Sequence, residues 1–173
     1  MKIIFNINQL YRITLGLFKP SVDYKQKIQA YYIVWPWMTE YFRTLQASEF
    51  PQMTDSARWE FAARTGLLSR MWKHRSYAVV GGQKIIYRRP IPIFSKICVT
   101  IQLEGFQGKW LFVKHQFHVK SKLYAVSWVK LSIRNRQGPL DVETLFEPNE
   151  KMKIPTEVEL MFQGDGDFIK SNC

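Results

Sequence analysis

Three consecutive segments in the middle of the chain alternate apolar and polar residues with a period of two. Apolar side chains fall at nearly every second position of residues 97–103, 111–119 and 123–133, with polar ones between them. This period predicts antiparallel strands that bury one face and expose the other. The joining sequences EGFQGK and KSK are short enough for tight turns. The stretch SYAVVGGQKIIYRRP predicts one further strand, in which the Gly-Gly pair favours a bulge.

A helical pattern precedes these strands. Residues 53–72 hold good helix formers, no proline and one glycine, which predicts a single long helix with Ser48 as its N-cap. Its apolar residues cover two adjoining sides, so the helix should be largely buried. Gly66 costs about 1 kcal/mol relative to alanine, and a close approach to a neighbouring sheet would explain it. The apolar residues are Met53, Ala57, Phe61, Leu68 and Trp72 on one side and Trp59, Ala62, Ala63, Leu67 and Met71 on the other.

The order of the elements predicts the architecture. The run IQAYYIVW, residues 28–35, predicts a strand before the helix. The only cover available for a long buried helix is then the antiparallel sheet, curled around it. We therefore predict an α+β fold in which one sheet wraps one long central helix. Near the C-terminus, TEVELMF predicts a last short strand, and GDGD predicts a mobile tail, since it lacks the other ligand positions of a calcium loop.

The first twenty residues are apolar but contain interruptions such as Asn6, Asn8 and Arg12. The segment is too polar for a membrane-spanning helix and lacks a small-residue cleavage site. Its apolar residues could line one broad side of a helix, which would rest on a membrane surface or pack on its own domain or on a partner subunit. Those residues are Ile3, Phe5, Ile7, Leu10, Ile13, Leu17 and Phe18.

Composition narrows the range of partners. A hydrophobic fraction of 46% excludes global disorder, and a net charge of +11 favours an acidic partner or simply a basic surface. Acidic partners include nucleic acid, anionic lipid, coenzyme A and acyl carrier protein. The basic sequences RMWKHR and YRRP lack the pattern of RNA-binding sheets, which disfavours nucleic acid. The two cysteines, Cys98 and Cys173, support neither a disulfide framework nor a zinc site and fit the reducing cytoplasm.

Several motifs in fixed order resemble a known family. They are VWP at residues 34–36, RTGLL at 64–68, YRRPI at 87–91 and the turn GFQGKW at 105–110. Together with LFKP at the end of the apolar segment, they resemble hotdog-fold thioesterases of the 4-hydroxybenzoyl-CoA thioesterase type, especially the THEM6-like subgroup, over about residues 10–145. The resemblance implies a hotdog domain at residues 21–148, between an N-terminal segment at 1–20 and a C-terminal extension at 149–173.

The resemblance also implies a catalytic loop, which this sequence alters. The family has an aspartate, a His-Met-Asn-Asn run and a helix acid, and Glu40, Thr44, Gln46 and Asp55 occupy the corresponding positions. Glu40 would then be the general base or nucleophile, and Asp55 would orient water or substrate. Thr44 and Gln46 could hydrogen-bond a substrate carbonyl or cap the loop. Backbone amides at the start of the helix would stabilise the oxyanion.

The expected substrate is an acyl thioester of coenzyme A or acyl carrier protein. The acyl chain would lie along the helix near Met53, Ala57 and Trp59, with Ser48 and Arg58 also in contact. Arginine and lysine side chains suit the phosphates of a coenzyme A or phosphopantetheine arm; the candidates are Lys73, Arg88 and Arg89. No cofactor is implied beyond this arm, and no metal. His115 is expected to be a satisfied core histidine.

Two other functions remain open. The altered loop could serve dehydration, cyclisation or condensation of an acyl thioester in a biosynthetic pathway, because one fold hosts several activities. Alternatively, the chain could be a non-catalytic protein that binds acyl groups. In each case exposed strand edges favour a homodimer or a higher homo-oligomer.

Overall fold

The computed structural model describes residues 2–146 and 152–163, with side chains from residue 9 onward. The GDGD sequence and most of the linker before the last helix lie outside this part, so their expectations stay untested. In chain order the elements are α1 (Lys2–Phe18), β1 (Ile28–Ile33), η1 (Pro36–Met38), β2 (Thr39–Glu40), β3 (Thr44–Leu45), α2 (Glu49–Arg64), α3 (Leu67–Lys73), β4 (Tyr77–Tyr87), β5 (Lys96–Gln107), β6 (Trp110–Val119), β7 (Lys122–Asn135), β8 (Gly138–Pro139), η2 (Val142–Leu145) and α4 (Thr156–Phe162).

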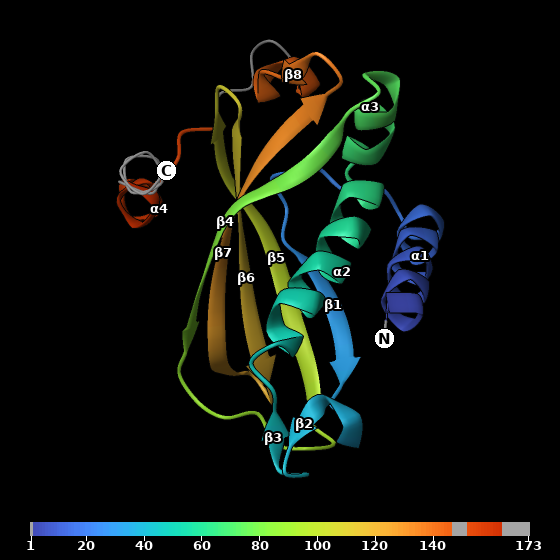
Figure 1. Cartoon of the computed structure of the whole chain (residues 1–173), viewed down its shortest axis with the longest axis vertical. Helices are drawn as coiled ribbons and strands as arrows, with labels where there is room; N and C mark the ends of the chain where they lie inside the picture. Colours follow the sequence, from blue (N-terminus) through green and yellow to red (C-terminus); the bar gives the residue numbers. More distant parts are fainter. Residues whose placement is uncertain (1, 147–151, 164–173) are drawn as a thin grey trace.

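A curved antiparallel sheet packs against α2, as the period-two pattern predicts. The strand order is β1-β5-β6-β7-β4, and β8 adds to β7. Alternate residues of β5 and β6, including Val99, Ile101 and Phe117, are completely buried against the helix. Figure 1 shows the sheet, α2 and α1 as successive layers, with α4 on the opposite side of the sheet. The prediction of an α+β fold with one central helix is therefore confirmed.

The predicted single helix is in fact two helices. The helix α2 begins at Glu49 and ends at Arg64, and α3 follows after Gly66, whose φ angle is +71°. No described atom lies within 4 Å of the position that a Cβ on Gly66 would take. The explanation by a close approach of the sheet is therefore wrong. The glycine is needed because its left-handed backbone, which residues with a Cβ rarely adopt, ends one helix and starts the next.

Two smaller expectations have different outcomes. The bulge in β4 is confirmed, because the pairing register with β7 shifts between Val80 and Gly82. The last predicted strand is wrong, because TEVELMF forms α4. The physical reason is that Val158 and Phe162, one helical turn apart, pack together against Phe112 on the outer face of the sheet.

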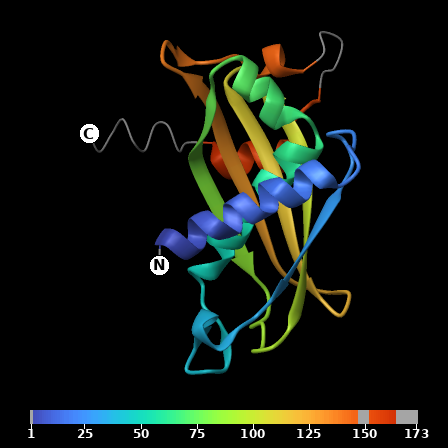
Figure 2. The same ribbon diagram turned by 90° about the vertical axis from the view of Figure 1, so that its right-hand side faces the viewer.

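The N-terminal helix packs on its own domain, one of the arrangements considered above. A Cβ added to Gly16 would lie 2.7 Å from the Cβ of Ala63, so the two helices touch almost backbone to backbone. The carboxylate of Glu60, fully buried on α2, pairs with Arg12 at 2.9 Å and with Lys19 at 2.6 Å. Figure 2 shows α1 crossing over α2 on the side away from the sheet.

Candidate functional site

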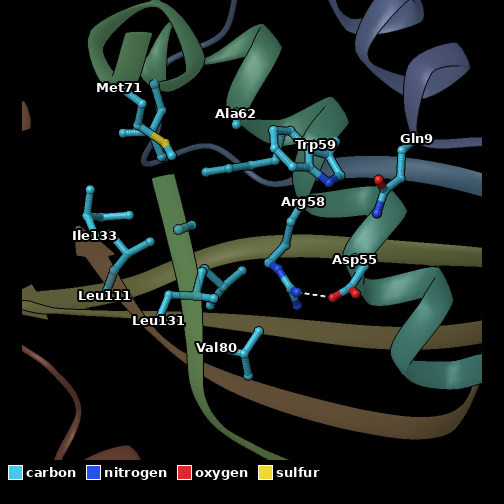
Figure 3. Close-up of a pocket in the computed structure, with 14 residues that line it drawn as sticks. Gln9, Asp55, Arg58, Trp59, Ala62, Met71, Val80, Leu111, Leu131 and Ile133 are labelled. Atoms are coloured by element: carbon cyan, nitrogen blue, oxygen red, sulfur yellow. Dashed lines mark hydrogen bonds and ion pairs between the residues drawn. The ribbon is translucent and has the colours of Figure 1, made fainter. Parts of the chain in front are cut away.

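A pocket of about 220 Å³ lies between α2, α3 and the inner face of the sheet. Its α2 residues share one broad helix face because each lies three or four positions from another of the set. They are Asp55, Arg58, Trp59, Phe61 and Ala62. Figure 3 shows the polar residues at one end of the pocket, where Gln9 reaches it from α1, and apolar residues at the other. The apolar residues include Leu67, Met71, Leu111, Leu131 and Ile133.

The charged residues that line this pocket are Asp55 and Arg58, and they form an ion pair. The Arg58 Nη2 donates to Asp55 Oδ1 (Figure 3), with the Arg58 side chain 13% exposed and that of Asp55 34%. Burial lowers the pKa of Arg58, and the negative charge of Asp55 opposes that shift. The guanidinium stays protonated, because an arginine pKa lies far above neutrality. Its other terminal nitrogen, Nη1, is buried and has no hydrogen-bond partner among the described residues.

A half-buried glutamine on β4 links α2 to the sheet near this pocket. The Gln83 Nε2 donates to Thr54 Oγ1 at 3.1 Å and to Ser127 Oγ at 3.2 Å. His115 lies beside Ser127 in the register of β6 and β7 and is completely buried. Burial first, and the charge of Arg58 second, hold the pKa of His115 well below its usual value, so the imidazole is neutral at pH 7.

His115 is therefore a core residue, as expected. A hydrogen bond with the backbone of Ser127 partly opposes the lowering of its pKa, and no better-aligned partner of either ring nitrogen is present among the described residues. Such a residue is hard to find in the sequence. It occupies an inward position of a period-two strand, and nothing in the pattern distinguishes a bonded from an unbonded histidine.

The residues of the expected catalytic loop lie elsewhere. Glu40 and Thr44 face each other in the two-stranded ribbon of β2 and β3, where Glu40 is exposed and Thr44 half-buried. Gln46 donates its Nε2 to the carbonyl of Thr39 at 3.0 Å, which caps the loop. Ser48 occupies the N-cap position of α2, but its side chain makes no capping hydrogen bond. None of these four residues lines the pocket of Figure 3.

The other expected substrate contacts also fall into residues that line the pocket and residues that do not. Trp59 lines the pocket beside Asp55 and Arg58, whereas Met53 and Ala57 belong to the buried core. The basic residues Lys73, Arg88 and Arg89 are exposed and do not line it. The sequence predictions missed Gln9 and the apolar end of the pocket, because the crossing of α1 over α2 and the packing of α3 on the strands join distant segments of the chain.

Two further features concern metal ions and membranes. Within residues 2–146 and 152–163, no three or more His, Cys, Asp or Glu side chains gather closely enough to bind a metal ion. Over the same part of the chain, no helix combines the length and the apolar character needed to cross a bilayer.

Comparison with solved structures defines the class of fold. A probable thioesterase from Escherichia coli, YbaW, superposes with a TM-score of 0.63 at 19% identity, over 67% of this chain and 90% of that one. A probable thioesterase from Bartonella henselae gives a TM-score of 0.61 at 18% identity, over 67% and 98%. The gentisyl-coenzyme A thioesterase BH1999 gives 0.59 at 13%, over 65% and 95%. The chain has the hotdog fold of these structures.

Sequence comparison then gives the family. The model of the thioesterase-like superfamily matches residues 34–159, so the chain belongs to that superfamily. Protein THEM6 of Drosophila melanogaster is 30% identical over 122 residues, which are 69% of this chain. The matched part is 63% of the THEM6 relative, so the chain spans less than two thirds of its length.

Proposed function

We propose that this chain binds the acyl group of an acyl thioester in the pocket beside α2 and hydrolyses the thioester with Asp55. The observation that carries the proposal is the position of Asp55, a partly exposed carboxylate at the polar end of an otherwise largely apolar pocket. Apolar pockets with a few convergent polar groups are the usual form of small-molecule sites. Membership of the thioesterase-like superfamily supports the reaction type.

The reaction needs one base and one water molecule. The Asp55 carboxylate takes a proton from water as the water oxygen attacks the thioester carbonyl carbon. The resulting tetrahedral intermediate then collapses, the C–S bond breaks, and the leaving thiolate takes the proton from Asp55. The products are one carboxylic acid and one thiol, and Asp55 returns to its ionised form.

The size of the pocket supports a short or medium acyl group. A cavity of about 150 Å³ holds benzene, and one water occupies about 30 Å³ of liquid. On that scale, 220 Å³ suits one aromatic ring or a chain of about six to eight carbons. The net charge of +11 supports a thiol carrier with acidic groups, coenzyme A or acyl carrier protein, with Lys73, Arg88 and Arg89 as candidate phosphate contacts.

A panel of thioesters tests this proposal. Acyl-coenzyme A and acyl carrier protein substrates with two to sixteen carbons, together with the benzoyl thioester, are incubated with the full chain while free thiol is measured. We expect kcat/KM to peak at about six to eight carbons or at benzoyl, because a longer chain exceeds the pocket. The Met71→Ala variant, enlarged at the apolar end, should shift the peak to longer chains.

The same panel separates the alternatives. Mass spectrometry that finds loss of water or a new ring in place of free acid would favour dehydration, cyclisation or condensation. Binding of acyl thioesters without turnover of any of them would favour a non-catalytic acyl-binding protein. That second candidate has its own support, since Glu40 is exposed and the Asp55 carboxylate is paired with Arg58.

We further propose a homodimer that forms through β4. This strand is an edge of the sheet, and its exposed apolar residues, Tyr77, Val79, Val80, Ile86 and Tyr87, would be covered by pairing with a second copy. The Val79→Lys variant, which places a charge on the edge, should halve the molar mass measured by light scattering, whereas Val79→Thr should not. A monomeric wild-type chain would contradict this proposal.

Cys98, a free thiol, is consistent with a reducing compartment.

A further inference from the structure

Exposed aromatic side chains gather at one end of the molecule. Figure 1 shows β2 and β3 at this lower end and α3 and β8 at the upper one. We define the aromatic end as residues 35–44, 88–96 and 120–122. Tyr41 is 91% exposed, Phe42 76% and Trp37 72%. The large apolar side chains that are exposed at this end are those of Trp35, Trp37, Tyr41, Phe42 and Phe94.

Contacts between the three segments make this end one surface. The amide of Ile93 donates to the carbonyl of Arg43 at 2.9 Å, which joins the first segment to the second. The third segment lies beside the second, because residues of both line one surface hollow. Those residues are Ile93, Phe94, Ser95, Lys96, Lys120 and Ser121. Large apolar side chains that are exposed together on one surface mark an interaction site.

The backbone of the loops presents these rings to solvent. Tyr41, Phe42 and Phe94 have φ angles of 48°, 54° and 60°. Bulky residues rarely adopt this left-handed conformation, because their Cβ atom crowds the backbone. Strained residues persist where the surrounding structure fixes them, and they concentrate at functional sites. The exposure of these rings is therefore a fixed property of the loops, although water is an unfavourable medium for apolar surface.

The charge of the aromatic end is strongly positive. Its three segments hold six lysine and arginine residues and one acid, Glu40, and all seven are exposed. Anionic lipids attract clusters of basic residues to a membrane surface. The charge therefore complements an anionic bilayer. The basic residues are Arg43, Arg88, Arg89, Lys96, Lys120 and Lys122.

The aromatic residues decide between a lipid surface and a nucleic acid. Single-stranded nucleic acid stacks its bases on free aromatic faces. Trp35 and Trp37 instead stack on each other, with ring centroids 5.4 Å apart, so each has one face fewer to offer. Trp and Tyr are enriched where a membrane meets water, and exposed Phe side chains enter the boundary between headgroups and acyl chains. This combination of residues favours a bilayer.

We infer that the aromatic end docks on an anionic membrane surface, with its rings at the boundary between headgroups and acyl chains and its basic side chains against the headgroups. The inference goes beyond the proposed function and places membrane contact outside the N-terminal segment. None of residues 35–44, 88–96 and 120–122 lines the pocket of Figure 3, and none belongs to β4. Docking by this end therefore uses neither the pocket nor the proposed dimer edge.

Sedimentation with lipid vesicles tests the inference on the full chain. One set of vesicles contains phosphatidylcholine alone, and the other contains phosphatidylcholine mixed with phosphatidylserine. We expect binding to the mixed vesicles to be at least about tenfold tighter and to weaken as sodium chloride is added, because salt screens the basic residues. Absence of binding to the mixed vesicles, or equal binding to both sets, would overturn the inference.

Paired variants test the two parts of the surface. Trp37→Ser with Phe42→Ser removes two rings and should weaken binding to the mixed vesicles at least about tenfold. Lys120→Gln with Lys122→Gln should weaken it about twentyfold, since each basic residue near the surface contributes about fivefold. Binding that is unchanged in both pairs would overturn the inference. Circular dichroism confirms that each variant folds.

Matched controls come from the opposite end of the molecule. Trp72→Ser removes a ring that is 85% exposed on α3, and Arg136→Gln removes an exposed charge between β7 and β8. Both should keep wild-type binding to the mixed vesicles, and losses equal to those of the paired variants would overturn the inference. Thioester turnover measured without vesicles should be the same in the paired variants as in the wild type, which separates docking from the proposed function.

Two other occupants of this surface are outcomes of the same experiment. A single-stranded oligonucleotide that binds the wild type, and not the paired variants, in the absence of vesicle binding would assign the aromatic end to nucleic acid and overturn the inference. A wild-type dimer that dissociates in Trp37→Ser with Phe42→Ser would assign this end to a second copy of the chain and likewise overturn it.

Discussion

Replacing Asp55 with asparagine is expected to lower kcat for thioester hydrolysis about 10²- to 10⁴-fold, the usual contribution of a positioned general base. Asparagine has nearly the same shape as aspartate, and its side-chain oxygen can still accept the hydrogen bond from Arg58. The pocket should therefore keep its form, and KM for a neutral thioester should change little. What is lost is the group that takes the proton from water. Thiol release under saturating substrate measures the effect.

Two further variants complete this experiment. Glu157→Gln, at an exposed position of α4, is the matched control for removal of a carboxylate and should keep wild-type activity. Glu40→Gln tests the role that the resemblance implies for the loop. If turnover is lost in Glu40→Gln and retained in Asp55→Asn, the chemistry belongs to the loop and the proposed role of Asp55 is wrong.

The second large effect concerns stability. Glu60→Leu should lower the free energy of unfolding by about 3–5 kcal/mol, because it leaves a buried cation without its partner. The Arg12 side chain is 11% exposed and lies 2.9 Å from Glu60, whereas Lys19 is 38% exposed and can turn toward water. Arg12 should therefore account for most of the loss. Urea denaturation followed by circular dichroism measures it.

A double mutant provides the control for this prediction. Combining Arg12→Met with Glu60→Leu removes the unpaired cation and fills its place with apolar atoms, so part of the lost stability should return. A loss below about 1 kcal/mol in Glu60→Leu alone would show that the pair behaves like an exposed ion pair. It would also show that α1 is held to α2 mainly by its apolar contacts.

The sheet could be predicted because each strand carries its own pattern. Inward residues such as Val99, Ile101 and Phe117 recur at every second position and are buried in the structure. The extent of the helix predicted at residues 53–72 is harder to obtain from the sequence. A glycine within an apolar helical pattern fits either a close contact or a break in the helix. Only the φ angle of Gly66 decides between the two. The sequence predicts a strand for TEVELMF, which forms α4. A short apolar run fits either element until its packing partner, here Phe112, is known.

The site could be predicted only in part. Asp55, Arg58 and Trp59 lie together because helical spacing places them on one face, and that spacing is visible in the sequence. The pocket itself depends on contacts between segments that are far apart in the chain. Gln9 reaches it from α1, and the apolar end combines α3 with three strands. No local pattern contains those contacts.

The close contact between α1 and α2 depends on one residue without a side chain. A methyl group on Gly16 would lie only 2.7 Å from the Cβ of Ala63, so a larger residue at this position would push one helix away from the other. Gln9, which lies on the same helix, lines the polar end of the pocket. The spacing of the two helices at Gly16 therefore also sets where this part of the pocket wall lies.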